Sequence, residues 1–152
     1  MGEANFDAEI RTALANFPVP ELEGQPFVIP KPLSECRVAL VTSAGLHKPE
    51  VDRFKSLDQS YRELSEPFES LVMSQGSQNF DRSGFMQDRN VVFPIDRLHE
   101  LADQGVIGSV AKKHYSFMGA IFEFSTIQQD SGPACAKQLI KDGTDVVLLT
   151  PV

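Results

Sequence analysis

Cysteine is scarce in this chain of 152 residues, which contains only Cys36 and Cys135. The two residues lie far apart and neither belongs to a C-x-x-C motif, so by themselves they build neither a disulfide framework nor a zinc site. This usage fits a reducing compartment, and we expect a cytoplasmic protein. Both cysteines are interpreted as small, buried hydrophobic side chains.

Long hydrophobic runs and an excess of basic charge are also lacking. No apolar run approaches the length that spans a membrane, and the N-terminus has no basic segment followed by an apolar one. The 21 carboxylates outnumber the 14 Lys and Arg residues, and the net charge of −7 repels phosphate backbones and anionic membranes. We therefore expect neither nucleic acid nor a membrane as a partner.

Several familiar site motifs are missing as well. The chain has no G-x-G-x-x-G, no G-x-x-x-x-G-K-[ST], no G-x-S-x-G and no H-E-x-x-H, so the usual cradles for dinucleotides, phosphates and zinc are not present. The three histidines are scattered, and we expect no metal. A metal-dependent hydrolase built on His47 and His114 is kept as a minor alternative. His99 falls on the polar side of a predicted helix and is interpreted as a solvated residue.

The first 32 residues are predicted to form a segment of their own, ahead of a single α/β domain over 33–152. Apolar residues recur every three or four positions at its start and predict a short amphipathic helix over about 5–16, packed on the main domain or on a second subunit. These residues are Phe6, Ile10, Leu14 and Phe17. Residues 18–32 hold five of the ten prolines and are expected to run extended.

Two unbroken apolar runs, 37–42 and 145–150, are typical of strands that are buried on both faces of a parallel sheet. We expect them to be neighbouring or near-neighbouring strands of a three-layer α/β domain with a mainly parallel sheet flanked by helices, Rossmann-like but without a nucleotide motif. The clearest helix is 94–104, which has a proline in its first turn and Gly105 as its stop. A second helix is expected from Ser131, as its cap, to Gly143.

The remaining elements are less strongly patterned. Leu139 and Ile140 are expected to face the core. The twenty or so residues after His47 and the segment 75–90 are predicted to be polar loops. The shorter predictions are a strand through 71–73, a strand end or approach to a helix at 91–93, a strand over 106–110, and a strand or buried turn over 115–124.

Seven short stretches share their order and spacing with one known family. They are 38–47, 60–63, 79–84, 90–98, 105–109, 114–119 and 145–152. Together they resemble the selenoprotein B family of glycine/sarcosine/betaine/D-proline reductases, over a region from about residue 36 to Val152. One departure is that the family usually carries a His ahead of the loop at Asp81, whereas residues 74–78 have none.

The resemblance implies a reductase that uses selenocysteine, or cysteine in its place, to cleave a C–N bond reductively in a small amino-acid-like substrate. It also implies a thioredoxin-type reductant and partner reductase subunits, one of which carries a pyruvoyl group. Family members continue after a stretch like 148–152 with selenocysteine or Cys, then Pro, another residue and Cys. We therefore expect a chain that stops, at a UGA read as a stop codon, just before its catalytic residue.

On this interpretation the chain holds no cofactor, the full-length protein contains selenocysteine, and the chain as given is inactive. A homodimer is expected to cover the sheet face that the truncation exposes. The alternative from another class is a non-catalytic binding or assembly subunit with the same fold.

The substrate pocket is placed at the carboxyl ends of the strands, because the loops that follow parallel strands converge there. Asp81 and Arg82 are considered as a charged clamp for a zwitterion. The residues predicted to bind substrate are Ser43, His47, Asp81, Asn90, His114 and Thr150.

Overall fold

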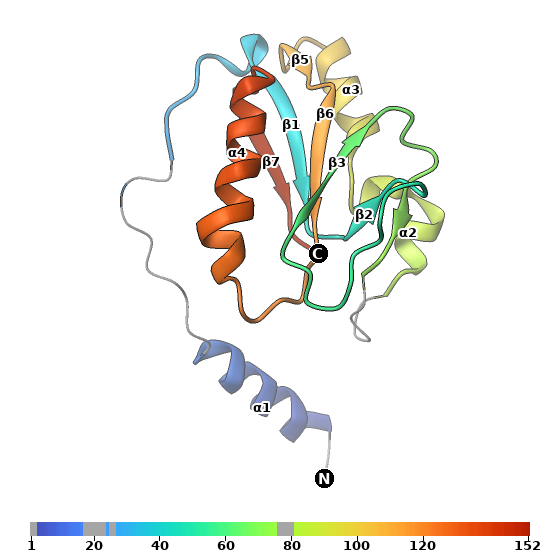
Figure 1. Cartoon of the computed structure of the whole chain (residues 1–152), viewed down its shortest axis with the longest axis vertical. Helices are drawn as coiled ribbons and strands as arrows, with labels where there is room; N and C mark the ends of the chain where they lie inside the picture. Colours follow the sequence, from blue (N-terminus) through green and yellow to red (C-terminus); the bar gives the residue numbers. More distant parts are fainter. Residues whose placement is uncertain (1–2, 17–23, 25–26, 76–80) are drawn as a thin grey trace.

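The computed structural model describes residues 3–16, 24, 27–75 and 81–152, apart from the side chains of residues 3–7 and 14. Its centre is a sheet of five strands with helices on both faces (Figure 1). The fold class predicted from the sequence is therefore confirmed.

The two unbroken apolar runs are adjacent parallel strands, as predicted, but the expected burial on both faces is wrong for 145–150, where Leu148 and Leu149 are exposed. Strand β1 (Arg37–Thr42) pairs along its length with β7 (Val146–Thr150), with Val38 opposite Val146 and Thr42 opposite Thr150. The other side of β1 pairs in parallel with β5 (Ser109–Val110) and β6 (Lys113–Phe117). The outer strand β3 (Tyr61–Ser65) runs antiparallel to β6.

Alternation along β1 divides the core into two layers. Val38 and Leu40 point to the face covered by α3 (Ile95–Asp103), whose Ile95 and Leu98 pack in the same cluster. Ala39 points to the opposite face, where it packs with Leu139 of α4 (Gly132–Lys141). Because successive side chains of a strand leave on opposite faces, one short apolar run holds helices on both sides of the sheet.

The polar segments contain regular structure that the sequence did not predict. Strand β3 lies in the first predicted loop, and the second contains helix α2 (Ser83–Gln87) and a single 3₁₀ turn over Arg89–Val91. The predicted strand over 106–110 is shortened to β5, and the segment 115–124 is a strand only as far as Phe117. A small antiparallel ribbon joins β2 (Leu46–His47) to β4 (Val72–Met73).

Two details of the second predicted helix are wrong. A turn of π-helix over Ile127–Ser131 leads directly into α4, and the hydroxyl of Ser131 donates to the carbonyl of Gln59 at 2.6 Å instead of capping the helix. Leu139 is buried, but Ile140 is 74% exposed. The core stripe of α4 is therefore narrower than the sequence pattern indicated.

At the N-terminus, helix α1 (Glu3–Ala15) forms where the apolar spacing predicted it, and Figure 1 shows it apart from the sheet. Phe17 and most of the proline-rich segment lie outside the described residues. In the described part of the chain, no helix has the length and hydrophobicity needed to cross a bilayer. Leu149 of β7 is 67% exposed, and the predicted homodimer stays a prediction.

Candidate functional site

The carboxyl ends of β1, β6 and β7 meet at one edge of the sheet, shown beside the C-terminus in Figure 1. The hydroxyls of Thr42 and Thr150 both donate to the carbonyl of Val92, at 2.9 and 3.1 Å. Just beyond the strands, the backbone N–H of Val152 donates to the hydroxyl of Ser43 at 2.8 Å. Two predicted site residues, Ser43 and Thr150, are thus brought together here, where each is engaged in holding a strand end.

Glycines allow this edge to close tightly. A Cβ on Gly119 would lie 2.8 Å from the carbonyl oxygen of Ser43 and 2.9 Å from both Nε2 of Gln75 and the carbonyl oxygen of Val152. Gly45 has a φ of +65°, which L-residues with side chains rarely adopt, and its carbonyl accepts from the N–H of Ser74 at 2.9 Å. The segment Ser74–Gln75 therefore packs against the end of the sheet.

Two neighbouring cavities, the smaller of which reaches this edge, share three lining residues, Phe54, Ser74 and Gln75. The larger, of about 780 Å³, is also lined by His47 and by charged side chains of both signs. Those charged side chains are Glu50, Asp52, Arg53 and Arg82. The smaller, of about 430 Å³, reaches Gly119 and is therefore adjacent to the end of β7.

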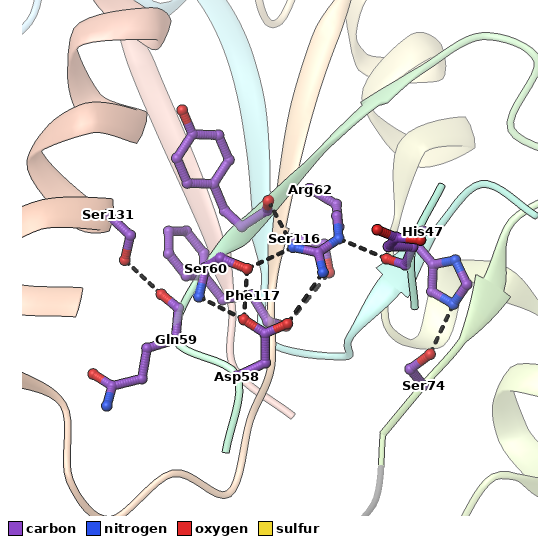
Figure 2. Close-up of polar contacts among 11 residues, drawn as sticks. His47, Asp58, Gln59, Ser60, Arg62, Ser74, Ser116, Phe117 and Ser131 are labelled. Carbon is purple, nitrogen blue, oxygen red and sulfur yellow. Dashed lines mark hydrogen bonds and ion pairs between the residues drawn. The ribbon is translucent and has the colours of Figure 1, made fainter. Parts of the chain in front are cut away.

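His47 is held by both ring nitrogens. Its Nδ1 lies 2.8 Å from the carbonyl oxygen of Lys48, and its Nε2 lies 2.7 Å from the hydroxyl of Ser74 (Figure 2). The ring is only 6% exposed and meets Phe54 edge to face, with 6.4 Å between ring centroids. His47 is therefore a fixed, nearly buried imidazole in the cavity wall.

One guanidinium fixes the loop that forms the outer wall of the cavities. Arg62 on β3 donates to the backbone carbonyl of Asp52 at 2.8 Å, to the hydroxyl of Ser60 at 2.6 Å and to the carboxylate of Asp58 at 3.1 Å (Figure 2). It also lies 4.3 Å from the centroid of the Phe54 ring, a cation–π contact. Burial raises the pKa of Asp58, but the hydrogen bonds from Ser60 and the charge of Arg62 outweigh it and leave that pKa below its usual range.

His114 occupies a different environment from His47. It is fully buried on β6 between Phe68 and Phe93, and its Nδ1 accepts from the N–H of Leu40 at 2.9 Å. Its Nε2 is buried with no hydrogen-bond partner among the described residues. Burial, followed by the charge of His99, lowers the pKa of His114 to about 4. His114 lines neither of the two cavities.

The other two predicted residues begin helices. Asp81 accepts from the N–H and the hydroxyl of Ser83, at 2.8 and 2.9 Å, and these bonds lower its pKa. The side chain of Asn90 accepts from the N–H of Asp96 at 3.1 Å and donates to the Asp96 carboxylate at 2.8 Å. Neither lines the cavities, although Arg82, next to Asp81, does and donates to the carbonyl of Gln75.

Sequence reasoning therefore found two wall residues, His47 and Arg82, and missed Phe54, Ser74 and Gln75. A serine and a glutamine after a two-residue strand carry no pattern that marks them as part of a site. Within the described residues, no group of three or more His, Cys, Asp or Glu side chains is arranged to hold a metal ion.

Known proteins resemble this chain over most of its length. The model of the family described as glycine/sarcosine/betaine reductase selenoprotein B matches residues 13–152. D-proline reductase subunit gamma of Acetoanaerobium sticklandii is 34% identical over 125 residues, which is 80% of this chain and 51% of that protein.

Two relatives come from Peptoclostridium acidaminophilum. Sarcosine reductase complex component B subunit beta is 29% identical over 79% of this chain, and glycine reductase complex component B subunit gamma is 28% identical over 88% of it. The chain covers 29% and 32% of those two proteins, so it spans about half the length of one relative and about a third of the other two. No solved structure matches the chain.

Proposed function

We propose that this chain, which belongs to the glycine/sarcosine/betaine reductase selenoprotein B family, is part of an oxidoreductase that reductively cleaves the C–N bond of a small amino acid. The observation that carries the proposal is the mixed-charge cavity, which shares Phe54, Ser74 and Gln75 with the smaller cavity that reaches Gly119, beyond the carboxyl end of β6. Open α/β sheets bind their ligands at the carboxyl ends of their strands.

The cavity suits a zwitterion. Arg53 and Arg82 offer cations to a carboxylate, and Glu50 and Asp52 offer anions to an ammonium group within the same cavity. A guanidinium matches the geometry of a carboxylate with two parallel donors. Among the six residues predicted from the sequence, we propose His47 as the one that faces the substrate.

The redox centre is proposed to follow Val152, as the family resemblance implies. The chain's own thiols support this assignment because both are buried. Burial raises the pKa of Cys135 to about 11, and the thiol of Cys36 lies 3.3 Å from the carbonyl oxygen of Lys31. Thiolates rather than thiols are nucleophilic, so Cys135 is not prepared for redox chemistry, and Cys36 is fully buried and lines neither cavity. The carbonyl oxygen of Val152, by contrast, lies beside Gly119, which lines the smaller cavity: a Cβ on Gly119 would be 2.9 Å from it.

The proposal extends to partners. D-proline reductase subunit gamma and the component B subunits are named as subunits. By analogy, this chain is proposed to act with other reductase subunits and a thioredoxin-type reductant.

Two measurements test the proposal. The genomic sequence past the codon for Val152 is expected to show UGA followed by in-frame Pro and Cys codons, and UAA, UAG or an unrelated downstream frame would contradict the assignment of the redox centre. Calorimetric titration with D-proline, sarcosine and glycine is expected to give saturable binding of at least one. His47→Gln should weaken that binding, whereas His99→Gln, on the exposed side of α3, should not. The cavity assignment is wrong if none of the three binds, or if both variants bind like the parent chain.

A further inference from the structure

A hydrogen-bonded pair in the cavity wall has chemistry that the family match does not assign. The β2–β4 ribbon places His47 opposite Val72, two residues before Ser74. The glycine turn at Gly45 fixes Ser74 from the other side, through the hydrogen bond from the Ser74 N–H to the Gly45 carbonyl. Backbone pairing within the ribbon therefore positions the imidazole, and the backbone hydrogen bond to Gly45 positions the hydroxyl. Figure 2 shows the two groups facing each other.

The hydrogen-bond partners determine the tautomer of His47. The carbonyl oxygen of Lys48, 2.8 Å from Nδ1, can only accept, so Nδ1 carries a hydrogen. In the neutral ring Nε2 is then the acceptor, and the Ser74 hydroxyl donates to it over 2.7 Å. In the imidazolium form the same contact reverses, with Nε2–H donating to the Ser74 oxygen and the hydroxyl hydrogen free to turn to another acceptor.

Of the two side chains, Ser74 is the more accessible to solvent. His47 is nearly buried and is covered by Phe54, over which the Arg62 guanidinium lies. Ser74 is only half buried and lines both cavities. Although His47 also lines the larger cavity, its Nδ1 is engaged by the Lys48 carbonyl and its Nε2 by Ser74, so a proton passing between Nε2 and the cavities would travel through the Ser74 hydroxyl.

We infer that Ser74 and His47 form a proton-transfer pair that serves the nitrogen of a small amine bound in the cavity. This rests on the proposed function, because the nitrogen keeps the electron pair of the broken C–N bond, and a substrate bound with an unprotonated amine must gain a proton there to leave as an amine. A selenolate or thiolate supplies the attack that forms the new bond to carbon. Ser74 gives its hydroxyl proton to the departing nitrogen and regains one from Nε2–H of the His47 imidazolium, which becomes neutral.

Replacing the hydroxyl by a thiol makes the pair measurable in the chain itself. In Ser74→Cys, His47 should accept the thiol proton and hold a thiolate, as histidine does for paired cysteines. At neutral pH we expect alkylation by iodoacetamide to be at least about tenfold faster than in Ser56→Cys, an exposed thiol at the smaller cavity. Adding His47→Gln should remove the acceleration at position 74 and leave position 56 unchanged. Circular dichroism checks that each variant is folded.

The outcomes separate the pair from the proposed function. Equal rates at positions 74 and 56, or an acceleration that survives His47→Gln, overturn the pair. Nitrogen-15 NMR spectra of the parent chain report the tautomer of the neutral His47 ring directly. Protonation on Nε2 rather than Nδ1 would also overturn the pair. D-proline, sarcosine or glycine should slow the alkylation of Ser74→Cys. Fast alkylation that none of the three slows overturns the link to an amine substrate, whatever the genomic sequence shows.

Discussion

The fully buried His114 makes a specific prediction about acid stability. Its pKa falls from 6.5 to about 4 because the charged form is desolvated in the core, with the charge of His99 adding to this. Between these two values the unfolded chain binds a proton that the folded chain does not, so the free energy of unfolding rises with pH. Lowering the pH from 7 to 5 should therefore cost about 2 kcal/mol through this one group.

The variant that tests it is His114→Gln, which keeps an acceptor for the N–H of Leu40 but does not titrate. Urea unfolding at pH 5, 6 and 7 should show that the variant loses about 2 kcal/mol less than the parent chain over this range. The matched control is His99→Gln, an exposed residue of α3, which should keep most of the pH dependence. A parent chain and His114→Gln with parallel pH profiles would refute the reasoning.

Three further predictions concern packing, thiols and the loop. Gly119→Ala should lower the free energy of unfolding by about 1–3 kcal/mol, because the new Cβ would lie 2.8–2.9 Å from three polar atoms. In the same urea titration Gly84→Ala should change the free energy of unfolding little, because its Cβ would lie 3.4 Å from the nearest side-chain atom. Both cysteines of the native chain should resist a chromogenic disulfide reagent until urea unfolds it, and rapid native reaction would contradict their burial. Arg62→Lys should weaken the loop clamp and speed protease cleavage within 48–60, while Arg97→Lys, in an exposed ion pair with Glu100, should not; equal cleavage of the two variants would count against the clamp.

The elements that could be predicted from the sequence are those that one strong pattern determines. The run that became β1 is apolar without interruption because both faces of this central strand are covered. The run that became β7 shows the same local pattern and was found for that reason, although β7 pairs only with β1 and leaves Leu148 and Leu149 exposed. The helix α3 combines a proline at its start, a glycine after its end and an apolar stripe. Local chemistry alone therefore determines these three elements.

Strand β3 could not be found in this way. It reads Tyr-Arg-Glu-Leu-Ser, and only Leu64 is fully buried. It is held by backbone pairing with β6 and by the ion pair between Lys113 and Glu63 at 2.9 Å. An edge strand takes its conformation from the strand that it pairs with. Here that strand, β6, lies about fifty residues away in sequence, so the residues around β3 do not by themselves predict a strand.

The site shows the same division between local and distant causes. His47 was predicted because it follows a buried strand, but His114, Asp81 and Asn90 were predicted to bind substrate beside it, and each of them also stands near the end or start of an element. The structure engages His114 with the backbone of β1, and Asp81 and Asn90 with the starts of helices. Polar residues at element ends have two uses, capping and ligand binding, and sequence position does not separate them.

One buried ring, Phe54, and one guanidinium, that of Arg62, hold the outer wall of the cavities in place. Phe54 is the one buried apolar side chain within 48–60, and Arg62 holds that segment to the sheet through its own hydrogen bonds and through the Phe54 ring. Between Lys48 and Phe54 the residues that line the cavity are exposed. Substitutions there should therefore cost little stability, whereas His47 and Ser74 are fixed by the ribbon and the glycine turn. Under the proposed function, this arrangement separates the residues proposed to select a ligand from the pair proposed to act on it.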